Sequence, residues 1–224
     1  SKKPNPDIAP PTGKKVAVVG SGPAGALAAK HAAAGGVKVL LLERKEVVGL
    51  PVRCGEGAGV RSLLENVQVE PDWVGERIIA VRMVAPDNTA VDIDRIDEGY
   101  VVRRDLMDPR LVEHARECGA EYRGGVTVVS VERGDDGRYT CRASDGRRFV
   151  GRCLVLAEGV EARLGRSLGW GEPVPLEDIC SCAFAHVRHG TVPQGKLEMH
   201  YGTSITPGGY GWVFPRGDGS ANGG

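Results

Sequence analysis

The sequence is poor in aromatic residues and has no excess charge of either sign. Aromatic side chains make up 5% of the 224 residues, and 29 basic residues balance 29 acidic ones. A neutral chain has no broad electrostatic field to attract nucleic acid or anionic lipid, so we expect no nucleic-acid partner. No apolar run approaches the ~20 residues that a bilayer-spanning helix needs. These absences favour a globular protein, and its length is sufficient to bury a core.

Cysteine and histidine are present, but not with the spacing of a metal site or a disulfide framework. The six cysteines form no zinc pattern and the five histidines form no ligand set, so we expect no metal. Together with the nucleotide-binding pattern described next, this favours reduced thiols and a cytoplasmic location. Cys180 and Cys182 are either a redox or metal pair or, as we favour, two small residues at the start of a strand.

Glycine, in contrast, is abundant, and the most informative segment is a glycine turn. Residues 20–25, GSGPAG, follow an apolar run, Lys15 to Val19, that is typical of a buried parallel strand. They open an Ala-rich stretch, Ala24 to Ala34, that predicts a helix. A second apolar run, Val37 to Leu42, ends in Glu43. Strand, glycine turn, helix, strand and acid in this order predict a dinucleotide-binding βαβ unit.

Each residue type in this pattern has a physical role. Gly20 permits the tight turn, Gly22 lets a pyrophosphate approach the backbone, and Gly25 lets the helix pack close to the sheet. The pyrophosphate then lies at the free N–H groups of the helix N-terminus. Glu43 can accept hydrogen bonds from ribose hydroxyls and disfavours a 2′-phosphate, so the expected nucleotide is of the FAD or NAD type. The alternative is a structural turn without a ligand.

The segments along the chain indicate two interleaved domains after a loose tail. Strands separated by Gly/Pro-rich turns follow Pro173, and the alternating segment 76–101 predicts two strands that pair with them. The expected organisation is a tail over 1–13, a nucleotide-binding domain over 14–75 and 102–172, and a sheet domain over 76–101 and 173–224.

Other elements follow from local patterns. In the first domain we expect a short helix at 60–65, a helix from Asp105 to Cys118, a third nucleotide-domain strand at 126–131, a hairpin with turns at 135–137 and 145–146, and a buried strand at 153–157. In the sheet domain we expect strands joined at 86–88, followed by antiparallel strands at 183–189, 196–201 and 210–214.

Two further segments carry candidate chemistry. The Gly-rich loop Pro51 to Gly57 contains Cys54, whose thiolate Arg53 could stabilise; the alternative is a turn that merely contains a cysteine. Alternation over residues 210–214 puts Tyr210, Trp212 and Phe214 on one face. That face is either core, which is the better interpretation in isolation, or the wall of an apolar ligand cavity.

Four segments taken together resemble the geranylgeranyl reductase family of flavoproteins, most closely its archaeal branch. They are residues 20–25 (GSGPAG), 51–57 (PVRCGEG), 100–108 (YVVRRDLMD) and 207–215 (PGGYGWVFP). The first resembles the family's FAD-binding turn and the last its P-x-x-Y-x-W-x-F-P signature, which is associated with the lipid site. In the third, Arg104 matches a flavin-contacting arginine of the family.

The resemblance implies an α/β fold (α+β overall) like that of p-hydroxybenzoate hydroxylase. It comprises a Rossmann-type FAD-binding domain and an interleaved antiparallel-sheet substrate domain over the isoalloxazine. The family's later flavin motif is absent, so we expect the C-terminal part of a longer chain to be missing. The implied activity is FAD-dependent saturation of C=C bonds in geranylgeranyl chains during phospholipid biosynthesis. The implied partners are a prenylated lipid and an external electron donor, either reduced ferredoxin or NAD(P)H, and a peripheral membrane contact is left open.

Candidate site residues follow from the glycine turn and from the resemblance. The expected cofactor contacts are Gly20, Gly22, Ala24, Gly25, Glu43, Arg44, Arg53, Cys54, Gly55, Gly57, Arg104, the backbone of Val128, Glu158 and Gly159. Glu158 stands where the family usually has Asp, so its side chain reaches further. The catalytic candidates are Cys54, as proton donor, and Glu56; the substrate candidates are Tyr210, Trp212 and Phe214.

Two alternatives to the reductase stay open. One is a flavin-dependent monooxygenase or halogenase on the same fold, against which the loop around Cys54 and the segment around Tyr210 argue. The other is a catalytically inactive flavin-fold fragment that binds lipid chains.

Overall fold

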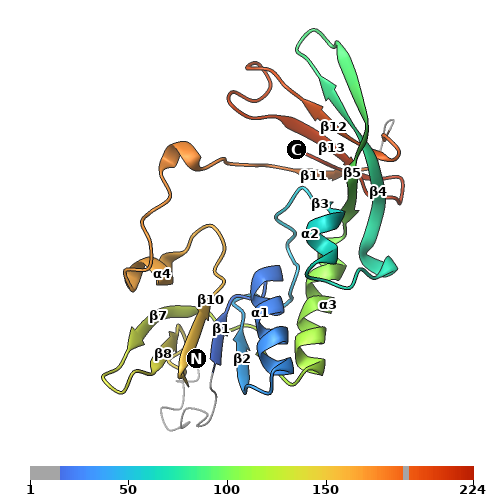
Figure 1. The fold of residues 1–224 in the computed structure, drawn as a ribbon. Helices are drawn as coiled ribbons and strands as arrows, with labels where there is room; N and C mark the ends of the chain where they lie inside the picture. The colour runs from blue at the N-terminus through green and yellow to red at the C-terminus, as the bar shows by residue number, and fades with distance from the viewer. Residues whose placement is uncertain (1–15, 189–191) are drawn as a thin grey trace. The chain divides into compact units, whose positions relative to one another are not determined.

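The computed structural model describes residues 16–188 and 192–224 of the chain (Figure 1). The predicted tail over 1–13 lies outside the described residues. The chain forms two compact units: a first unit of Ser1–Pro51 and Asp108–Val174, and a second unit of Val52–Met107 and Pro175–Gly224. In the part of the chain that is described, no helix is both long and apolar enough to cross a bilayer.

The first unit contains the predicted βαβ arrangement. The strands β1 (Val16–Val19), β2 (Val39–Leu42), β6 (Glu121–Arg123) and β10 (Cys153–Leu156) form a parallel sheet in the order β10-β1-β2-β6. Helix α1 (Pro23–Ala34) connects β1 to β2 and lies against them (Figure 1). Short side chains let this helix approach the sheet closely, and Ala26, Ala29 and Ala33 are buried. The glycine-turn interpretation of the local structure is confirmed.

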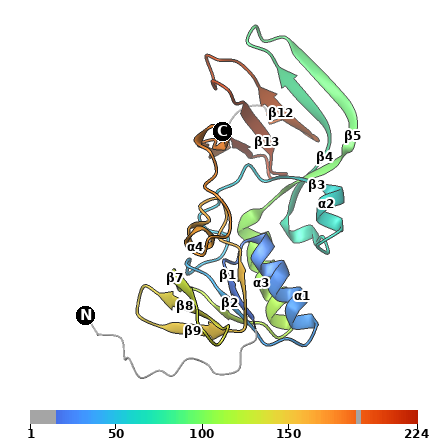
Figure 2. The same ribbon diagram turned by 60° about the vertical axis from the view of Figure 1, so that its left-hand side comes forward.

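A second sheet covers the other face of β1 and β2. The antiparallel strands β7 (Val128–Arg133), β8 (Tyr139–Ala143) and β9 (Arg148–Gly151) form it. Its buried Phe149 packs in one core cluster with side chains of β1 and β2, including Leu40. The turns predicted near 135–137 and 145–146 are the two connections of this sheet, which Figure 2 shows beside β1.

The predicted third strand of the nucleotide domain was wrong. Residues 128–133 form β7 of the separate antiparallel sheet, whereas the parallel neighbour of β2 is β6. The sequence of β6 is Glu-Tyr-Arg, and three residues with two charges show no apolar run. Two further helices are α3 (Arg104–Glu117) and α4 (Arg163–Ser167). The bounds of α3 are close to the predicted ones.

The second unit is built on a seven-stranded sheet. Its strands are β3 (Gly57–Gly59), β4 (Val74–Val84), β5 (Ala90–Val102), β11 (Ala185–Val187), β12 (Lys196–His200), β13 (Gly211–Pro215) and β14 (Ala221–Gly223), in the order β11-β14-β13-β12-β4-β5-β3. Short helical segments are α2 (Val60–Leu64), η1 (Pro71–Trp73) and η2 (Leu176–Asp178). The expected pairing of segment 76–101 with the later strands is confirmed by the β4–β12 pair.

Three details of this sheet differ from the expectation. The pair β4–β12 is parallel rather than antiparallel, and β14 was not predicted. Residues 52–75 and 102–107 belong to the second unit instead of the nucleotide-binding one. The reason is that β3 pairs with β5, and the N–H of Val102 donates to the carbonyl of Glu56 at 2.8 Å.

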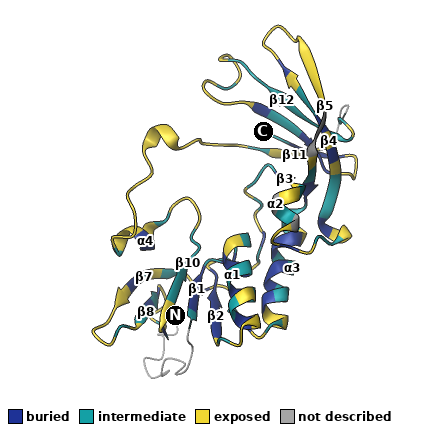
Figure 3. Cartoon of the chain, viewed as in Figure 1, coloured by how far each residue is buried: buried dark blue, intermediate teal, exposed yellow. Residues whose placement is uncertain are grey.

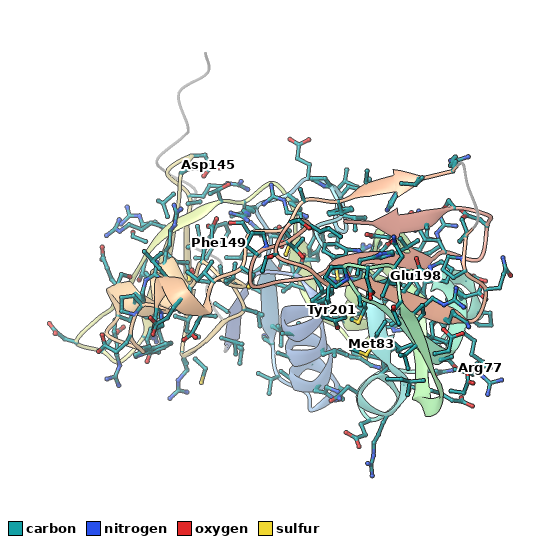
Figure 4. All side chains as sticks on the ribbon, turned by 90° about the horizontal axis from the view of Figure 1, so that it is seen from above. Arg77, Met83, Asp145, Phe149, Glu198 and Tyr201 are labelled. Carbon is teal, nitrogen blue, oxygen red and sulfur yellow. The ribbon has the colours of Figure 1, made fainter. Side chains whose placement is uncertain are left out.

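Replacement of Phe149, which is labelled in Figure 4, tests the packing of the first unit. Its side chain is 1% exposed, with the Arg123 guanidinium 5.5 Å from the ring centroid. We expect Phe149→Ala to lower the free energy of unfolding by about 3–5 kcal/mol, measured by urea denaturation. The control is Val129→Ala in β7, where the side chain is 56% exposed and a loss below about 1 kcal/mol is expected. Equal losses in both variants would contradict this packing.

Candidate functional site

The glycine turn of the first unit leaves room for a ligand at one position only. A Cβ on Gly20 would lie 2.2 Å from the carbonyl oxygen of Ala157, and a Cβ on Gly25 would lie 1.8 Å from the carbonyl oxygen of Gly20. Gly20 also has a φ of +98°, which favours glycine. A Cβ on Gly22, in contrast, would meet nothing within 4 Å. Gly20 and Gly25 therefore serve the fold, and Gly22 borders open space at the N-terminus of α1, where a pyrophosphate fits.

Glu43 is held rigidly beside this turn. Its side chain is buried, and Oε2 accepts hydrogen bonds from the N–H and the hydroxyl of Ser21 at 2.8 and 2.9 Å. Oε1 accepts the N–H of Lys45 at 2.9 Å. Carboxylate oxygens have further lone pairs, so ribose hydroxyls can still bind there. The structure thus brings together the turn and the acid that the sequence pattern paired.

Tyr122, in β6, is a neighbour of Glu43 that the sequence analysis did not predict. Burial, and secondly the negative charge of Glu43, raise the pKa of its phenol. No sequence signal pointed to it, because β6 itself was not predicted.

Five other expected cofactor contacts of the first unit have these places in the fold. The carboxylate of Glu158 accepts the N–H groups of Leu164 and Gly165 at 2.8 and 2.9 Å, at the N-terminus of α4. Arg44 is exposed and lies 3.7 Å from Glu161. Val128 begins β7, and Ala24 and Gly159 lie in the first turn of α1 and directly after Glu158. Their contacts with a cofactor stay predictions.

In the second unit, the Cys54 loop packs against the aromatic segment. A Cβ on Gly55 would lie 3.4 Å from Nε1 of Trp212, and a Cβ on Gly57 would lie 3.3 Å from Cε2 of Phe214. Glycine at these positions therefore lets the loop approach the rings closely. Two hypotheses that the sequence left separate, a reactive loop and an aromatic wall, concern adjacent residues in the structure.

The side chain of Glu56 anchors this loop from within. It is completely buried, and its φ of +70° lies in the left-handed region, where a non-glycine residue is strained. Its Oε2 lies 2.9 Å from Nε of Arg216, and Oε1 accepts the N–H of Arg104 at 3.2 Å. The N–H of Glu56 donates to Sγ of Cys54 at 3.3 Å, which orients the thiol. Glu56 therefore holds the conformation on which the position of Cys54 depends.

Asn222 links the loop to the aromatic wall. This fully buried side chain on β14 donates through Nδ2 to the carbonyl of Cys54 at 2.9 Å and to Oε2 of Glu56 at 3.1 Å. Its Oδ1 accepts the indole N–H of Trp212 at 3.0 Å. An indole N–H can only donate and a carbonyl can only accept, so the amide has one satisfactory orientation.

Arg216 completes a buried polar network that no sequence pattern had indicated. Its side chain is 7% exposed, and besides Glu56 it lies 3.3 Å from Oδ1 of Asp105 and 3.3 Å from Nδ1 of His186. Arg216 directly follows the aromatic segment, which is the only hint in the sequence. Its partners Glu56 and Asp105 lie 160 and 111 positions away in the chain and could not be inferred from spacing.

The three aromatic candidates differ in burial. Phe214 belongs to a core cluster with Ile78 and Val101, whereas Trp212 is half-buried and Tyr210 is 43% exposed. Successive ring centroids lie 6.2 Å apart from Tyr210 to Trp212 and from Trp212 to Phe214. The segment thus runs from the core to the surface, which is consistent both with a core strand and with the wall of an apolar ligand cavity. A contact with substrate stays a prediction.

The remaining candidates lie at or near the surface of the second unit. Cys54 and Arg104 are half-buried and Arg53 is exposed. Cys180 and Cys182 are exposed and precede β11 rather than starting it. Among residues 16–188 and 192–224, no three His, Cys, Asp or Glu side chains gather as a metal-ion site.

Comparison with protein families matches both parts of the chain. Residues 14–165 match the model of the pyridine nucleotide-disulphide oxidoreductases, and residues 178–224 match the geranylgeranyl reductase catalytic domain. The digeranylgeranylglycerophospholipid reductase of Methanocella arvoryzae is 36% identical over 92% of this chain and 55% of the relative. The chain thus spans about half the length of the curated relatives it matches.

Solved structures with a similar fold include a geranylgeranyl reductase-like protein and a flavin-dependent halogenase. A geranylgeranyl bacteriochlorophyll reductase-like protein from Thermoplasma acidophilum has a TM-score of 0.80 at 27% identity, covering 93% of this chain and 55% of that one. The halogenase PltM, solved with phloroglucinol and FAD, has a TM-score of 0.69 at 15% identity over 94% of this chain and 51% of its own, and so supports the fold alone. The expected fold class and the resemblance to geranylgeranyl reductases are confirmed.

Removal of Arg216 tests the buried network. Arg216→Ala leaves the carboxylate of Glu56 buried without its countercharge, so we expect a loss of about 3–5 kcal/mol in the free energy of unfolding. The control is Arg82→Ala, which removes the exposed ion pair between Arg82 and Asp92; water screens that pair, so its loss should change the stability far less. Urea denaturation of both variants measures the difference, and similar midpoints would show that the buried pair does not stabilise the second unit.

Proposed function

This chain belongs to the pyridine nucleotide-disulphide oxidoreductase family, and from that premise we propose that it is part of an FAD-dependent geranylgeranyl reductase. The enzyme saturates C=C bonds of geranylgeranyl chains in the synthesis of archaeal-type membrane phospholipids. The observation that carries the proposal is the packing of the Cys54–Gly57 loop against Trp212 and Phe214, which puts a thiol and an apolar wall in one place. The similarity to digeranylgeranylglycerophospholipid reductases supports the substrate class.

FAD is the cofactor of this proposal, and the first unit has the features needed to hold its nucleotide part. The N-terminus of α1 offers free N–H groups to the pyrophosphate, and the open space at Gly22 gives access to them. Glu43 offers carboxylate oxygens to ribose hydroxyls. When reduced, FAD supplies the hydride that one alkene carbon accepts.

The residues of the second unit supply the rest of the reaction. Cys54 donates the proton that the other alkene carbon needs, and the hydrogen bond from the N–H of Glu56 fixes the direction of the sulfur. Trp212 and Phe214 form an apolar wall that excludes water from the reacting chain. Glu56, bound to Arg216 and Asn222, supports the loop rather than donating the proton itself.

An external donor must deliver the two electrons, and reduced ferredoxin or NAD(P)H would serve. A peripheral contact with the membrane would bring the lipid to the enzyme. The halogenase or monooxygenase alternative rests on fold alone, and the match of residues 178–224 to a geranylgeranyl reductase catalytic domain favours the reductase. Flavin content after purification separates both enzymes from an inactive lipid-binding protein.

Gly22→Val tests the cofactor site. The backbone at Gly22 has a φ of −62° and a ψ of 178°, which valine adopts without strain, and a Cβ there meets no protein atom within 4 Å. The valine side chain fills only the space meant for the pyrophosphate. We therefore expect the variant to fold and to lose FAD, measured by flavin absorbance after gel filtration.

Two measurements make this result decisive. Gly25→Ala should instead unfold the first unit, because its Cβ would collide with the carbonyl of Gly20. The melting temperature of Gly22→Val should match that of the flavin-free parent. Undiminished FAD binding by Gly22→Val would refute the assignment of the turn.

Cys54→Ala tests the proton donor. We expect it to retain FAD and to lose alkene reduction by roughly 10²–10⁴-fold, with little recovery in Cys54→Ser because a hydroxyl is a much weaker acid. Cys153→Ala, which changes an exposed cysteine of the first unit, is the matched control and should keep normal turnover. Near-normal turnover of a prenyl lipid by both Cys54 variants would leave the thiol as a flavin contact only.

A further inference from the structure

Asn222 lies at the centre of a cross-strand row in the second unit's sheet. It is the register partner of His186 on β11 and of Phe214 on β13. Register partners point to the same side of a sheet, so the three side chains share the face against which the Cys54 loop packs. Strand β13 is buried or half-buried along its whole length, as its dark blue and teal colours in Figure 3 show. Strand pairing on both sides therefore fixes the backbone of Asn222 within an enclosed region.

The hydrogen bonds at this place require an amide. The side chain must donate to the carbonyl of Cys54 and to the carboxylate of Glu56, and it must accept the indole N–H of Trp212. An ionised carboxylate only accepts, and a hydroxyl donates a single proton, whereas a primary amide donates two protons and accepts. Glutamine carries the same groups on a longer side chain, and a fully buried site does not take a further methylene without displacement. Asparagine is thus the residue that meets all three requirements.

Loss of the Asn222 amide would not release the whole network. Glu56 would keep its ion pair with Arg216, whose Nε lies 2.9 Å from Oε2. The carbonyl of Cys54 and the indole N–H of Trp212 would instead lose the amide that joins them. The ion pair therefore maintains the conformation of the loop, and the amide determines where the loop lies relative to the ring.

Resting on the proposed function, we propose that Asn222 is a positioning residue that fixes the Cys54 thiol at one place relative to the ring of Trp212. A proton donor must lie close to the carbon that it protonates, and a displacement of ~1 Å can lower a rate about a hundredfold. Asn222 touches neither alkene nor cofactor and acts through the two residues that it joins. Because its amide accepts the indole N–H, Trp212 presents only its ring to an apolar chain.

Two substitutions separate the hydrogen bonds of the amide. Asn222→Ala removes all of them. Asn222→Asp keeps an acceptor for the indole N–H of Trp212, but its carboxylate cannot donate to the carbonyl of Cys54. A positioning role therefore predicts different effects of the two variants on the ring and on the thiol, whereas a general loss of stability would affect both together.

The aspartate adds a negative charge beside Glu56, whose Oε2 lies 3.1 Å from Nδ2 of Asn222. Two basic side chains face the same oxygen: Nε of Arg216 lies 2.9 Å from it and Nε2 of His186 lies 3.5 Å from it. Measurements at about pH 6, below the usual pKa of histidine, let a protonated imidazole offset part of the added charge.

The reactivity of Cys54 reports its position without any substrate. All variants are made in the whole enzyme with FAD bound, a methanethiosulfonate reagent labels the thiols, and peptide mass spectrometry locates the label at Cys54. We expect Cys54 to be labelled about fivefold faster in both Asn222 variants than in the parent, the effect of one lost hydrogen bond. The matched control is Asn88→Asp at the exposed turn of the β4–β5 hairpin, which should leave this rate unchanged.

Turnover distinguishes positioning from stability. Asn222→Asp should lower kcat for a prenyl lipid by about tenfold to a hundredfold with KM unchanged, because Trp212 keeps its acceptor. Asn222→Ala should lower kcat and also raise KM. Equal changes of kcat and KM in both variants, in proportion to a fall in melting temperature and FAD content, would show a merely structural role and overturn the proposal.

Trp212→Phe tests the same coupling without a change at Asn222. It removes the indole N–H and keeps an aromatic ring, so Cys54 should be labelled faster than in the parent. Addition of Asn222→Ala should then change the labelling rate no further, because the connection is already broken. An unchanged rate in Trp212→Phe, or independent effects of the two substitutions, would show that ring and thiol are held separately.

The outcomes distinguish the two proposals. If the parent enzyme with FAD bound reduces no prenyl lipid, the proposed function fails, whereas the labelling rates still test the position of Cys54. If the parent is active and Asn222→Ala matches it in labelling rate and in kcat, only the role of Asn222 fails. If Asn222→Ala does not fold, the labelling rate of Trp212→Phe decides.

Discussion

The second unit depends on one buried ion pair, between Glu56 and Arg216. A charge removed from water is tolerated only when it is paired and its hydrogen bonds are satisfied, so each partner requires the other. The pair joins segments 160 positions apart in the chain. It also fixes a strained backbone at Glu56, and through that residue's N–H it sets the direction of the Cys54 thiol.

Asn222 extends this constraint to the aromatic wall. Its Nδ2 donates to the carbonyl of Cys54 and to the carboxylate of Glu56, and its Oδ1 accepts the indole N–H of Trp212. These partners permit only this orientation of the amide. The thiol and the wall therefore have a common support, and neither can shift without leaving a buried polar group unpaired. Such pre-organisation suits a site in which an apolar chain must be held against reactive groups without water.

The first unit depends on a steric constraint instead. Gly20 and Gly25 cannot carry a Cβ, because the carbonyl groups of Ala157 and Gly20, respectively, occupy that space. This close approach brings the N-terminus of α1 to the edge of the sheet, where Ser21 binds Glu43. The pattern is local in sequence, which is why the turn, α1, β1 and β2 were all predicted, as were the hairpin turns of the three-stranded sheet.

The sequence by itself determined the elements whose signals lie within a few residues: the glycine turn, the Ala-rich helix, the apolar strands, the aromatic segment and the Cys54 loop. Only the tertiary structure decided what these elements contact. Strand β6 is too short and charged to show a pattern, and the parallel pair β4–β12 depends on the arrangement of the whole sheet. The partners of Glu56 are likewise scattered from Arg104 to Asn222. Ion pairs and hydrogen bonds act between atoms that folding brings together, and the spacing of residues along the chain does not indicate which atoms these are.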